Sequence, residues 1–381
     1  MTQTPVTETL TQPTLPTEAP PAPRKKSVRL PFLDWSRGLA ATIMLQGHVF
    51  HSFARPELRD SGPYVISQFI GGIAPAIFLF LTGITFSFLM HGMERRAASA
   101  KDRVITALRR AGYLGLLAFA FRIQLFLFGA PHSPAADLLK VDILNCMGFA
   151  IVTMAGFAVL KTAQRVHAGV IVGLLIATLS PLVALIPPDT LPKLLRMYVV
   201  PDANYFAYFP WASFLAFGVS AGSILRLVKE DQMHRVMQWA AILGFGLIIS
   251  GQYFSNLPYS LYPAVDFWIN SPGLIFIKLG VILVLLALTF LWTHHGAGHG
   301  WSWVRQLGVT SLLVYWVHIE LVYGRWFGFW KENLTIAQCT LAAITLIVAM
   351  IGLSYMRTNM RWPALRLGDV LPAEPRRVSG D

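Results

Sequence analysis

The sequence predicts an all-α membrane protein, a polytopic bundle of about ten transmembrane helices with both termini in the cytoplasm. Hydrophobic residues make up 55% of the 381 residues and charged residues only 13%, against roughly 25% charged in ordinary soluble domains. Long apolar segments follow one another along the chain, each about long enough to cross a bilayer. Lys and Arg are concentrated in alternate loops, as membrane topology requires.

The chain begins with residues 1–29, which are rich in Thr and Pro and end in basic residues. This segment lacks the apolar stretch of a secretory signal, so we predict a disordered cytoplasmic tail. Residues 30–362 hold all the apolar segments and form the predicted transmembrane domain. Residues 363–381 are predicted to be a second, short cytoplasmic tail.

Ten spans are predicted, and the loop charges support that number. With the N-terminus inside, Lys and Arg on the inner side outnumber those on the outer side roughly threefold. The fifth segment is the weakest, because Pro181, Pro187 and Pro188 shorten or kink it. The predicted spans cover residues 32–54, 64–90, 104–128, 138–160, 168–186, 208–226, 236–254, 273–292, 304–324 and 336–356.

The first span is the most informative, because it carries Asp34, Arg37, His48 and His51. Ionisable residues are costly inside a bilayer and are therefore the first candidates for function. Arg37 and His48 are eleven residues apart, which places them on one helix face, separated by roughly 16 Å along the axis. Such a polar stripe needs a polar partner or cavity.

The direction of each span sets the depth of its polar residues, and several fall at one level in the outer half of the membrane. His318 and Glu320 are only two residues apart and point to different helix faces, so we choose His318 as the one that faces the site. We predict a polar chamber that opens outward and connects to the cytoplasm along the helix face of Arg37. The residues at the outer level are His48, Arg122, Asp142, Asn145, Lys278, His318 and Glu320.

Several motifs, in their order along the chain, resemble a known family of transmembrane acyltransferases. The first is Leu33-Asp34-Trp35-Ser36-Arg37-Gly38, followed by Met44 and His48; the later ones are residues 69–83, Val141-Asp142-Ile143-Leu144-Asn145-Cys146-Met147-Gly148, Phe209-Pro210-Trp211 and residues 307–320. This order resembles the heparan-alpha-glucosaminide N-acetyltransferase catalytic-domain family, over about residues 30–325. The spacing from arginine to histidine in the first span also resembles the broader acyltransferase-3 family.

The resemblance implies a membrane acyltransferase that moves an acetyl or other short acyl group from cytoplasmic acyl-CoA, such as acetyl-CoA, to an acceptor amine or hydroxyl at the outer side. A carbohydrate is the expected acceptor, and the bacterial inner membrane is the expected location. On this hypothesis His48 is a general base or the nucleophile of an acyl-imidazole intermediate. Arg37 and the basic second inner loop, which carries Arg109 and Arg110, would bind the CoA phosphates. The predicted acceptor-site residues are Arg122, Asp142, Asn145, Trp211 and His318.

Each of these residues also has a simpler interpretation. His48 can be a helix-packing hydrogen bonder, and Arg37 an interfacial anchor. Asp142 can be the charge partner of Arg122 or Lys278 without a role in chemistry. Trp211 can belong to the interfacial aromatic belt.

Two other functions stay open at this stage. A proton-coupled transporter needs a similar intramembrane cluster of His, Asp and Arg, although no internal repeat of the kind common in carriers is visible. A non-catalytic partner in envelope assembly would leave the cluster unexplained.

The sequence does not predict a metal site or a nucleic-acid partner. Cys146 and Cys339 both lie in apolar runs, and the histidines of residues 294–299 have no carboxylate or cysteine near them in the sequence. The net charge of +12 comes from basic residues in alternate loops, which is a pattern of membrane topology. The lipid bilayer is the expected environment.

Overall fold

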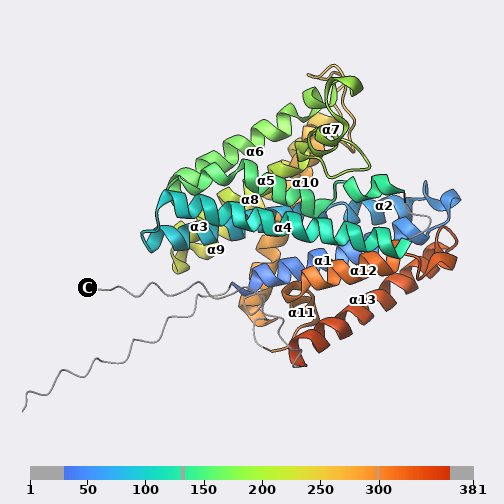
Figure 1. Cartoon of the computed structure of the whole chain (residues 1–381). Helices are drawn as coiled ribbons and strands as arrows, with labels where there is room; N and C mark the ends of the chain where they lie inside the picture. Colours follow the sequence, from blue (N-terminus) through green and yellow to red (C-terminus); the bar gives the residue numbers. More distant parts are fainter. Residues whose placement is uncertain (1–29, 130–133, 298–299, 361–381) are drawn as a thin grey trace, which may run out of the picture. The chain divides into compact units, whose positions relative to one another are not determined.

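The computed structural model describes residues 30–129, 134–297 and 300–360, and the regular elements in these ranges are all helices (Figure 1). The predictions for the two tails fall on residues 1–29 and 361–381, outside the described residues. The longer helices are α1 (Pro31–Phe53), α2 (Gly62–Gly71), α3 (Ala74–Arg95), α4 (Ala100–Gly129), α5 (Ile143–Thr153), α6 (Thr162–Ala184), α7 (Lys193–Val199), α8 (Tyr208–Leu227), α9 (Met233–Ser255), α10 (Pro272–Trp292), α11 (Trp303–Val309), α12 (Ser311–Tyr323) and α13 (Ile336–Asn359).

Each of the ten apolar segments contains helix, and seven described helices are long and apolar enough to cross a membrane. Those seven are α2 with α3, α4, α6, α8, α9, α10 and α13. The fifth predicted segment is among them, since α6 runs through Pro181 to Ala184, so its prolines do not shorten it below span length. The count of ten and the side on which the termini lie stay predictions.

The three remaining segments differ from a regular span in identifiable ways. The first, α1, has 23 residues, but its polar residues lower its mean hydropathy. The fourth contains α5, which has only 11 residues and continues into a short 3-10 helix. The ninth is divided between α11 and α12 at Thr310, and α12 has 13 residues.

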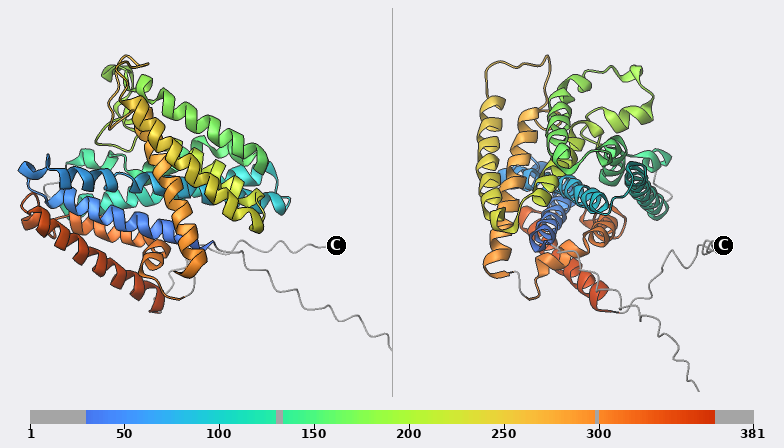
Figure 2. Two further views of the ribbon diagram at one scale, coloured as in Figure 1. Left: turned by 180° about the vertical axis from the view of Figure 1, so that it is seen from behind. Right: turned by 90° about the vertical axis from the view of Figure 1, so that its left-hand side faces the viewer.

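Helix α1 is surrounded by other helices, which explains how it can carry charged and imidazole side chains. It contacts α2, α3, α10, α11, α12 and α13, and the views in Figures 1 and 2 show it running among them. Such contacts shield polar groups from lipid and offer them partners. A Cβ added to Gly47 would lie 2.8 Å from Gly71 Cα, so this close approach of α1 to α2 requires glycine.

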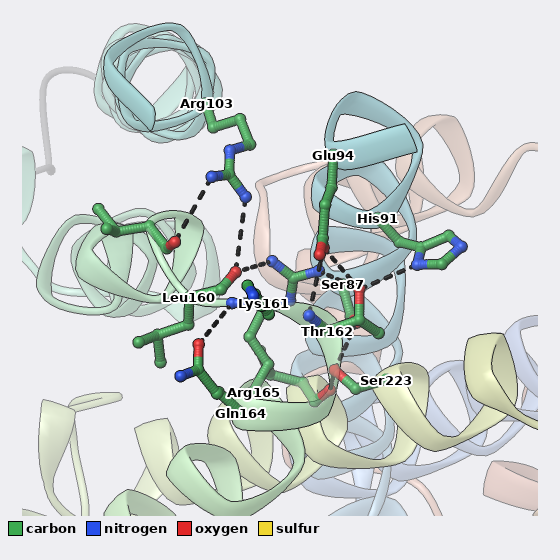
Figure 3. A network of polar contacts seen from close by, with 12 residues as sticks. Ser87, His91, Glu94, Arg103, Leu160, Lys161, Thr162, Gln164, Arg165 and Ser223 are labelled. Atoms are coloured by element: carbon green, nitrogen blue, oxygen red, sulfur yellow. Dashed lines mark hydrogen bonds and ion pairs between the residues drawn. The ribbon is translucent and has the colours of Figure 1, made fainter. Parts of the chain in front are cut away.

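Helices α3 and α6 are joined by a polar network at the end predicted to be cytoplasmic (Figure 3). The guanidinium group of Arg165 is fully buried; it donates to the Leu160 carbonyl at 2.7 Å and pairs with Glu94 Oε2 at 2.9 Å. Thr162 donates to the same carboxylate oxygen from its backbone N–H at 3.2 Å and from its hydroxyl at 2.7 Å. His91 Nδ1 lies 2.9 Å from that hydroxyl. The network therefore fixes the start of α6 against the end of α3.

Candidate active site

The candidate site is built around a pair of histidines, His48 on α1 and His318 on α12. His48 Nδ1 lies 2.9 Å from His318 Nε2, and the two rings are inclined by only 14°. His318 is fully buried, whereas His48 keeps part of its surface exposed. The choice of His318 over Glu320 agrees with this geometry, because Glu320 instead accepts a hydrogen bond from the indole of Trp326 at 3.2 Å.

The hydrogen bonds assign the tautomer of both rings. His318 Nδ1 lies 2.7 Å from the Val314 carbonyl oxygen, and a carbonyl can only accept, so His318 carries its proton on Nδ1. In a neutral ring His318 Nε2 is then the acceptor, and His48 must donate to it from Nδ1. A neutral His48 therefore has its lone pair on Nε2, the nitrogen that the pair leaves available.

Aromatic side chains surround the two histidines. Tyr323 packs edge-on against His48, with ring centroids 5.4 Å apart, and its hydroxyl lies 3.1 Å from Nδ1 of the exposed His51. Tyr315 packs against His318 at 5.9 Å. Neither tyrosine was recognised from the sequence. Tyr315 lies three residues before His318 on α12, so its spacing from that residue was a usable signal, whereas Tyr323, five residues after it, has no such spacing.

Arg122 and Asp142 form an ion pair beside Tyr315. Arg122 Nε is 3.3 Å from Asp142 Oδ2, close enough for charge attraction although these two atoms are not oriented for a hydrogen bond. Tyr315 is near enough to both charges to interact with them electrostatically. Of the two charge partners that the sequence left open for Asp142, the structure selects Arg122.

Asp142 also has a local structural role at the start of α5. Its Oδ1 accepts hydrogen bonds from the backbone N–H groups of Leu144 at 3.0 Å and Asn145 at 3.1 Å. This is an N-cap, which satisfies donors that have no partner within the helix. Both carboxylate oxygens of Asp142 therefore have a partner: Oδ1 accepts from the backbone of α5, and Oδ2 pairs with Arg122.

Asn145 and Trp211 were predicted to line the same site, and the structure gives them other partners. Asn145 donates from Nδ2 to the Tyr198 hydroxyl at 2.9 Å. Trp211 lies beneath Lys278, whose Nζ is 4.9 Å from the ring centroid. Within the described part of the chain, neither residue makes a hydrogen bond, ion pair or ring contact with His48.

A second group of charges lies toward the other end of α1. Arg37 Nη1 is 3.1 Å from Asp34 Oδ1. Arg110 on α4 donates to the Thr85 hydroxyl at 3.2 Å and is close enough to Arg37 for the two positive charges to repel. Arg110 belongs to the basic second inner loop that the sequence predicts to hold the donor phosphates together with Arg37. The structure indicates Arg110 as the member of that loop whose charge acts on Arg37.

No group of His, Cys, Asp or Glu in residues 30–129, 134–297 and 300–360 is arranged to hold a metal ion. His294 and His295 pack against the ring of His234, at 4.3 Å and 6.5 Å between centroids. His299, which also belongs to this stretch of the sequence, lies outside the described residues.

The fold and the site thus define a class: a multi-pass helical membrane protein with a hydrogen-bonded pair of imidazoles on α1 and α12, and with two arginines, on α1 and α4, toward the other end of α1. The family model described as "Heparan-alpha-glucosaminide N-acetyltransferase, catalytic" matches residues 29–259, more than half of the chain. The protein belongs to this family of transmembrane acetyltransferases. No curated protein matches it significantly. The matched range includes Arg37 and His48 and ends before His318.

Proposed function

We propose that this protein transfers an acetyl or other short acyl group from cytoplasmic acyl-CoA to an amine or hydroxyl at the outer side of the membrane, with a carbohydrate as acceptor. The observation that carries the proposal is the hydrogen bond between His48 and His318, with the tautomers it implies. The proposed topology is that predicted from the sequence, with residues 30–362 as the transmembrane domain, both termini in the cytoplasm, and the bacterial inner membrane as the location.

In the simplest route His48 acts as a general base. The acceptor nitrogen or oxygen attacks the carbonyl carbon of the thioester, and His48 Nε2 takes its proton. The carbon–sulfur bond breaks, and the CoA thiolate receives that proton from His48 to leave as the thiol. His318 is a positioning residue in this scheme, because it orients His48 and accepts from Nδ1 while the positive charge develops.

A second route uses the same lone pair as the nucleophile. His48 Nε2 attacks the thioester carbonyl, the carbon–sulfur bond breaks, and CoA leaves as the thiolate, which takes a proton from water, while His318 Nε2 accepts the Nδ1 proton of the acyl-imidazolium. The acceptor then attacks the acetyl-imidazole, the bond to Nε2 breaks, the acceptor's proton passes to water, and His318 returns its proton to His48 Nδ1. Incubation with acetyl-labelled CoA without acceptor separates the routes, since only this one transfers label to the protein with release of one equivalent of CoA.

Arg37 and Arg110 are the proposed binding residues for the donor phosphates. The positive charges of Arg37 and Arg110 repel each other, and an anion bound near both would relieve that repulsion and accept bidentate hydrogen bonds. Arg37 and His48 are separated by roughly 16 Å along α1. The pantetheine arm of CoA is long enough to bridge this separation, so phosphates at Arg37 would present the thioester near His48.

Substitution of Arg110 tests the donor site. We expect Arg110→Met to raise KM for acetyl-CoA by about tenfold, because a charge-assisted phosphate contact is lost, with little change in KM for the acceptor. Its neighbour Arg109 is exposed and forms no hydrogen bond or ion pair with the described residues, so Arg109→Met is the matched control with the same change in net charge. If both substitutions raise KM equally, Arg110 contributes only its positive charge and makes no specific contact with the phosphates.

Substitution of His318 tests the positioning role. We expect His318→Leu to lower kcat by roughly 10–100-fold while KM for acetyl-CoA stays unchanged, because His48 loses the acceptor that fixes its tautomer. In His318→Gln the side-chain oxygen can accept from His48 Nδ1, so part of the activity should return. A variant with leucine that turns over at the wild-type rate would remove His318 from the mechanism.

The function itself is tested with purified protein, labelled acetyl-CoA and a panel of amino sugars. The proposal expects consumption of thioester together with an acetylated sugar. The cluster of His, Asp and Arg is equally compatible with a proton-coupled transporter, and uptake of the sugar into vesicles without use of acetyl-CoA would favour that alternative.

A further inference from the structure

Lys278 is a positive charge inside α10 that the mechanism above does not use. It lies about two turns from the start of the helix at Pro272 and is mostly buried. Among the described residues, it forms no hydrogen bond and no ion pair. Moving an ammonium group from water into the protein without a partner costs roughly several kcal/mol of desolvation free energy. Such a residue indicates a ligand that supplies the missing negative charge.

The surroundings of Lys278 form a small pocket with aromatic walls. The cavity has a volume of about 20 Å³ and is lined by Lys278, Trp211, Phe214, Trp268 and Ser271, among others. This volume holds about one water molecule, or one oxygen of a larger group that enters from outside. The indole of Trp211 lies under the ammonium group at 4.9 Å, and Trp268 is 59% exposed, so an aromatic surface extends from the charge outward.

The C-terminal end of α2 lies close to the ammonium group of Lys278 and weakly stabilises its positive charge. Helix α2 ends at Gly71, and a Cβ added to Gly72 would lie 3.7 Å from Lys278 Nζ. The C-terminal end of a helix carries partial negative charge, which favours a cation there. This accounts for part of the cost of burying Lys278, yet it supplies no hydrogen-bond acceptor that the structure records.

The pocket is also adjacent to the helix that carries His48. Gly71 packs directly against Gly47, the residue before His48, and Gln68 of the same α2 turn donates to the Gly47 carbonyl at 3.2 Å. A molecule held at Lys278 would therefore lie across the last turn of α2 from the histidine pair. That is a suitable position for one end of an acceptor whose other end reaches His48.

We propose that Lys278, with Trp211 and Trp268, binds an oxyanion carried by the carbohydrate acceptor, a carboxylate or a phosphate. The ammonium group donates to the oxyanion, and the indoles contact the apolar faces of the sugar ring. Trp211, which was predicted to line the acceptor site, would do so through this pocket. This site would bind the acceptor of the proposed acyl transfer, so the activity test below rests on the proposed function, whereas the binding test does not.

Binding is tested first, without any reaction. The probes are glucuronate, glucose 6-phosphate and, as the neutral reference, glucose, each titrated into purified protein while the midpoint of thermal unfolding is followed. We expect a shift with at least one of the two anions and none with glucose; which anion acts distinguishes a carboxylate from a phosphate. Lys278→Met should weaken that binding by about tenfold or more, and Lys278→Arg should retain it.

Lys193→Met is the control, because this exposed lysine forms no side-chain hydrogen bond or ion pair with the described residues and its loss changes the net charge equally. Shifts that are the same in Lys278→Met and wild type, or no shift with either anion, would overturn the proposal. Lys278→Met is expected to fold, since methionine has a similar shape and removes an unpaired buried charge.

The activity test compares an amino sugar linked to a uronic acid with the same compound as its methyl ester. Wild-type protein should prefer the free acid by about tenfold in kcat/KM, and Lys278→Met should lose this preference, whereas the control Lys193→Met should keep it. A preference that survives in the variant would contradict the proposal. If wild-type protein consumes no acetyl-CoA with any acceptor, the proposed function fails, and the binding test still decides the role of Lys278.

Discussion

His48→Ala is expected to abolish turnover of acetyl-CoA, with a loss of about 10²–10⁴-fold in kcat, the usual contribution of a general base. The physical reason is that Nε2 of His48 is the nitrogen that the hydrogen bond to His318 leaves with a lone pair. The measurement is steady-state release of the CoA thiol with saturating acceptor. Binding of CoA to the variant should be retained, because Arg37 and Arg110 are unchanged.

His51→Ala is the matched control for this substitution. His51 lies three residues further along α1, is exposed, and contacts the same tyrosine, since the Tyr323 hydroxyl is 3.1 Å from its Nδ1. Its loss should change kcat by no more than a few-fold. Turnover that is intact in His48→Ala, or lost equally in both variants, would show that the imidazole of His48 has no chemical role.

Glu94→Gln is expected to destabilise the protein strongly, and more than Arg165→Leu does. The two residues form one ion pair, but Arg165 is fully buried whereas the Glu94 side chain is 30% exposed. Removing the carboxylate leaves a buried guanidinium without a counter-charge, which typically costs about 3–5 kcal/mol. Removing the guanidinium leaves a carboxylate that can reach water and still accepts from Thr162. The measurement is the midpoint of thermal unfolding in detergent for both variants.

Arg103→Leu provides the control for that comparison. Arg103 donates to the same Leu160 carbonyl as Arg165 does (Figure 3), but at 3.5 Å and from a partly exposed position, so its loss should cost less than about 1 kcal/mol. The double variant Glu94→Leu with Arg165→Leu should be more stable than Glu94→Gln alone, because no isolated charge remains. The reverse order of stability between Glu94→Gln and Arg165→Leu would contradict this account.

The helical segments could be predicted from the sequence because apolar runs of span length are a strong signal. Their interruptions could not. The break between α2 and α3 and the short α11 before α12 depend on how neighbouring helices pack, as the contact of Gly71 with Gly47 illustrates. Composition alone also cannot explain how α1 holds its polar residues, because these are tolerated through contact with six other helices.

The candidate site was predictable where depth and helix face sufficed. The assumption of alternating spans placed His48, His318, Arg122 and Asp142 at one level, and the structure joins these residues in two pairs, His48 with His318 and Arg122 with Asp142. Depth carries no information on rotation about a helix axis. For this reason the sequence could not predict that Asn145 pairs with Tyr198 and that Trp211 packs against Lys278.

The role of His48 in acyl transfer across the membrane can be measured in reconstituted vesicles. Proteoliposomes are loaded with acetyl-labelled CoA on the side of Arg37, and an amino sugar is supplied on the other side. The account predicts labelled, acetylated sugar in the outer medium with an equal amount of free CoA inside, and neither product with His48→Ala. Sugar that accumulates inside the vesicles unmodified, with the CoA thioester intact, would contradict it.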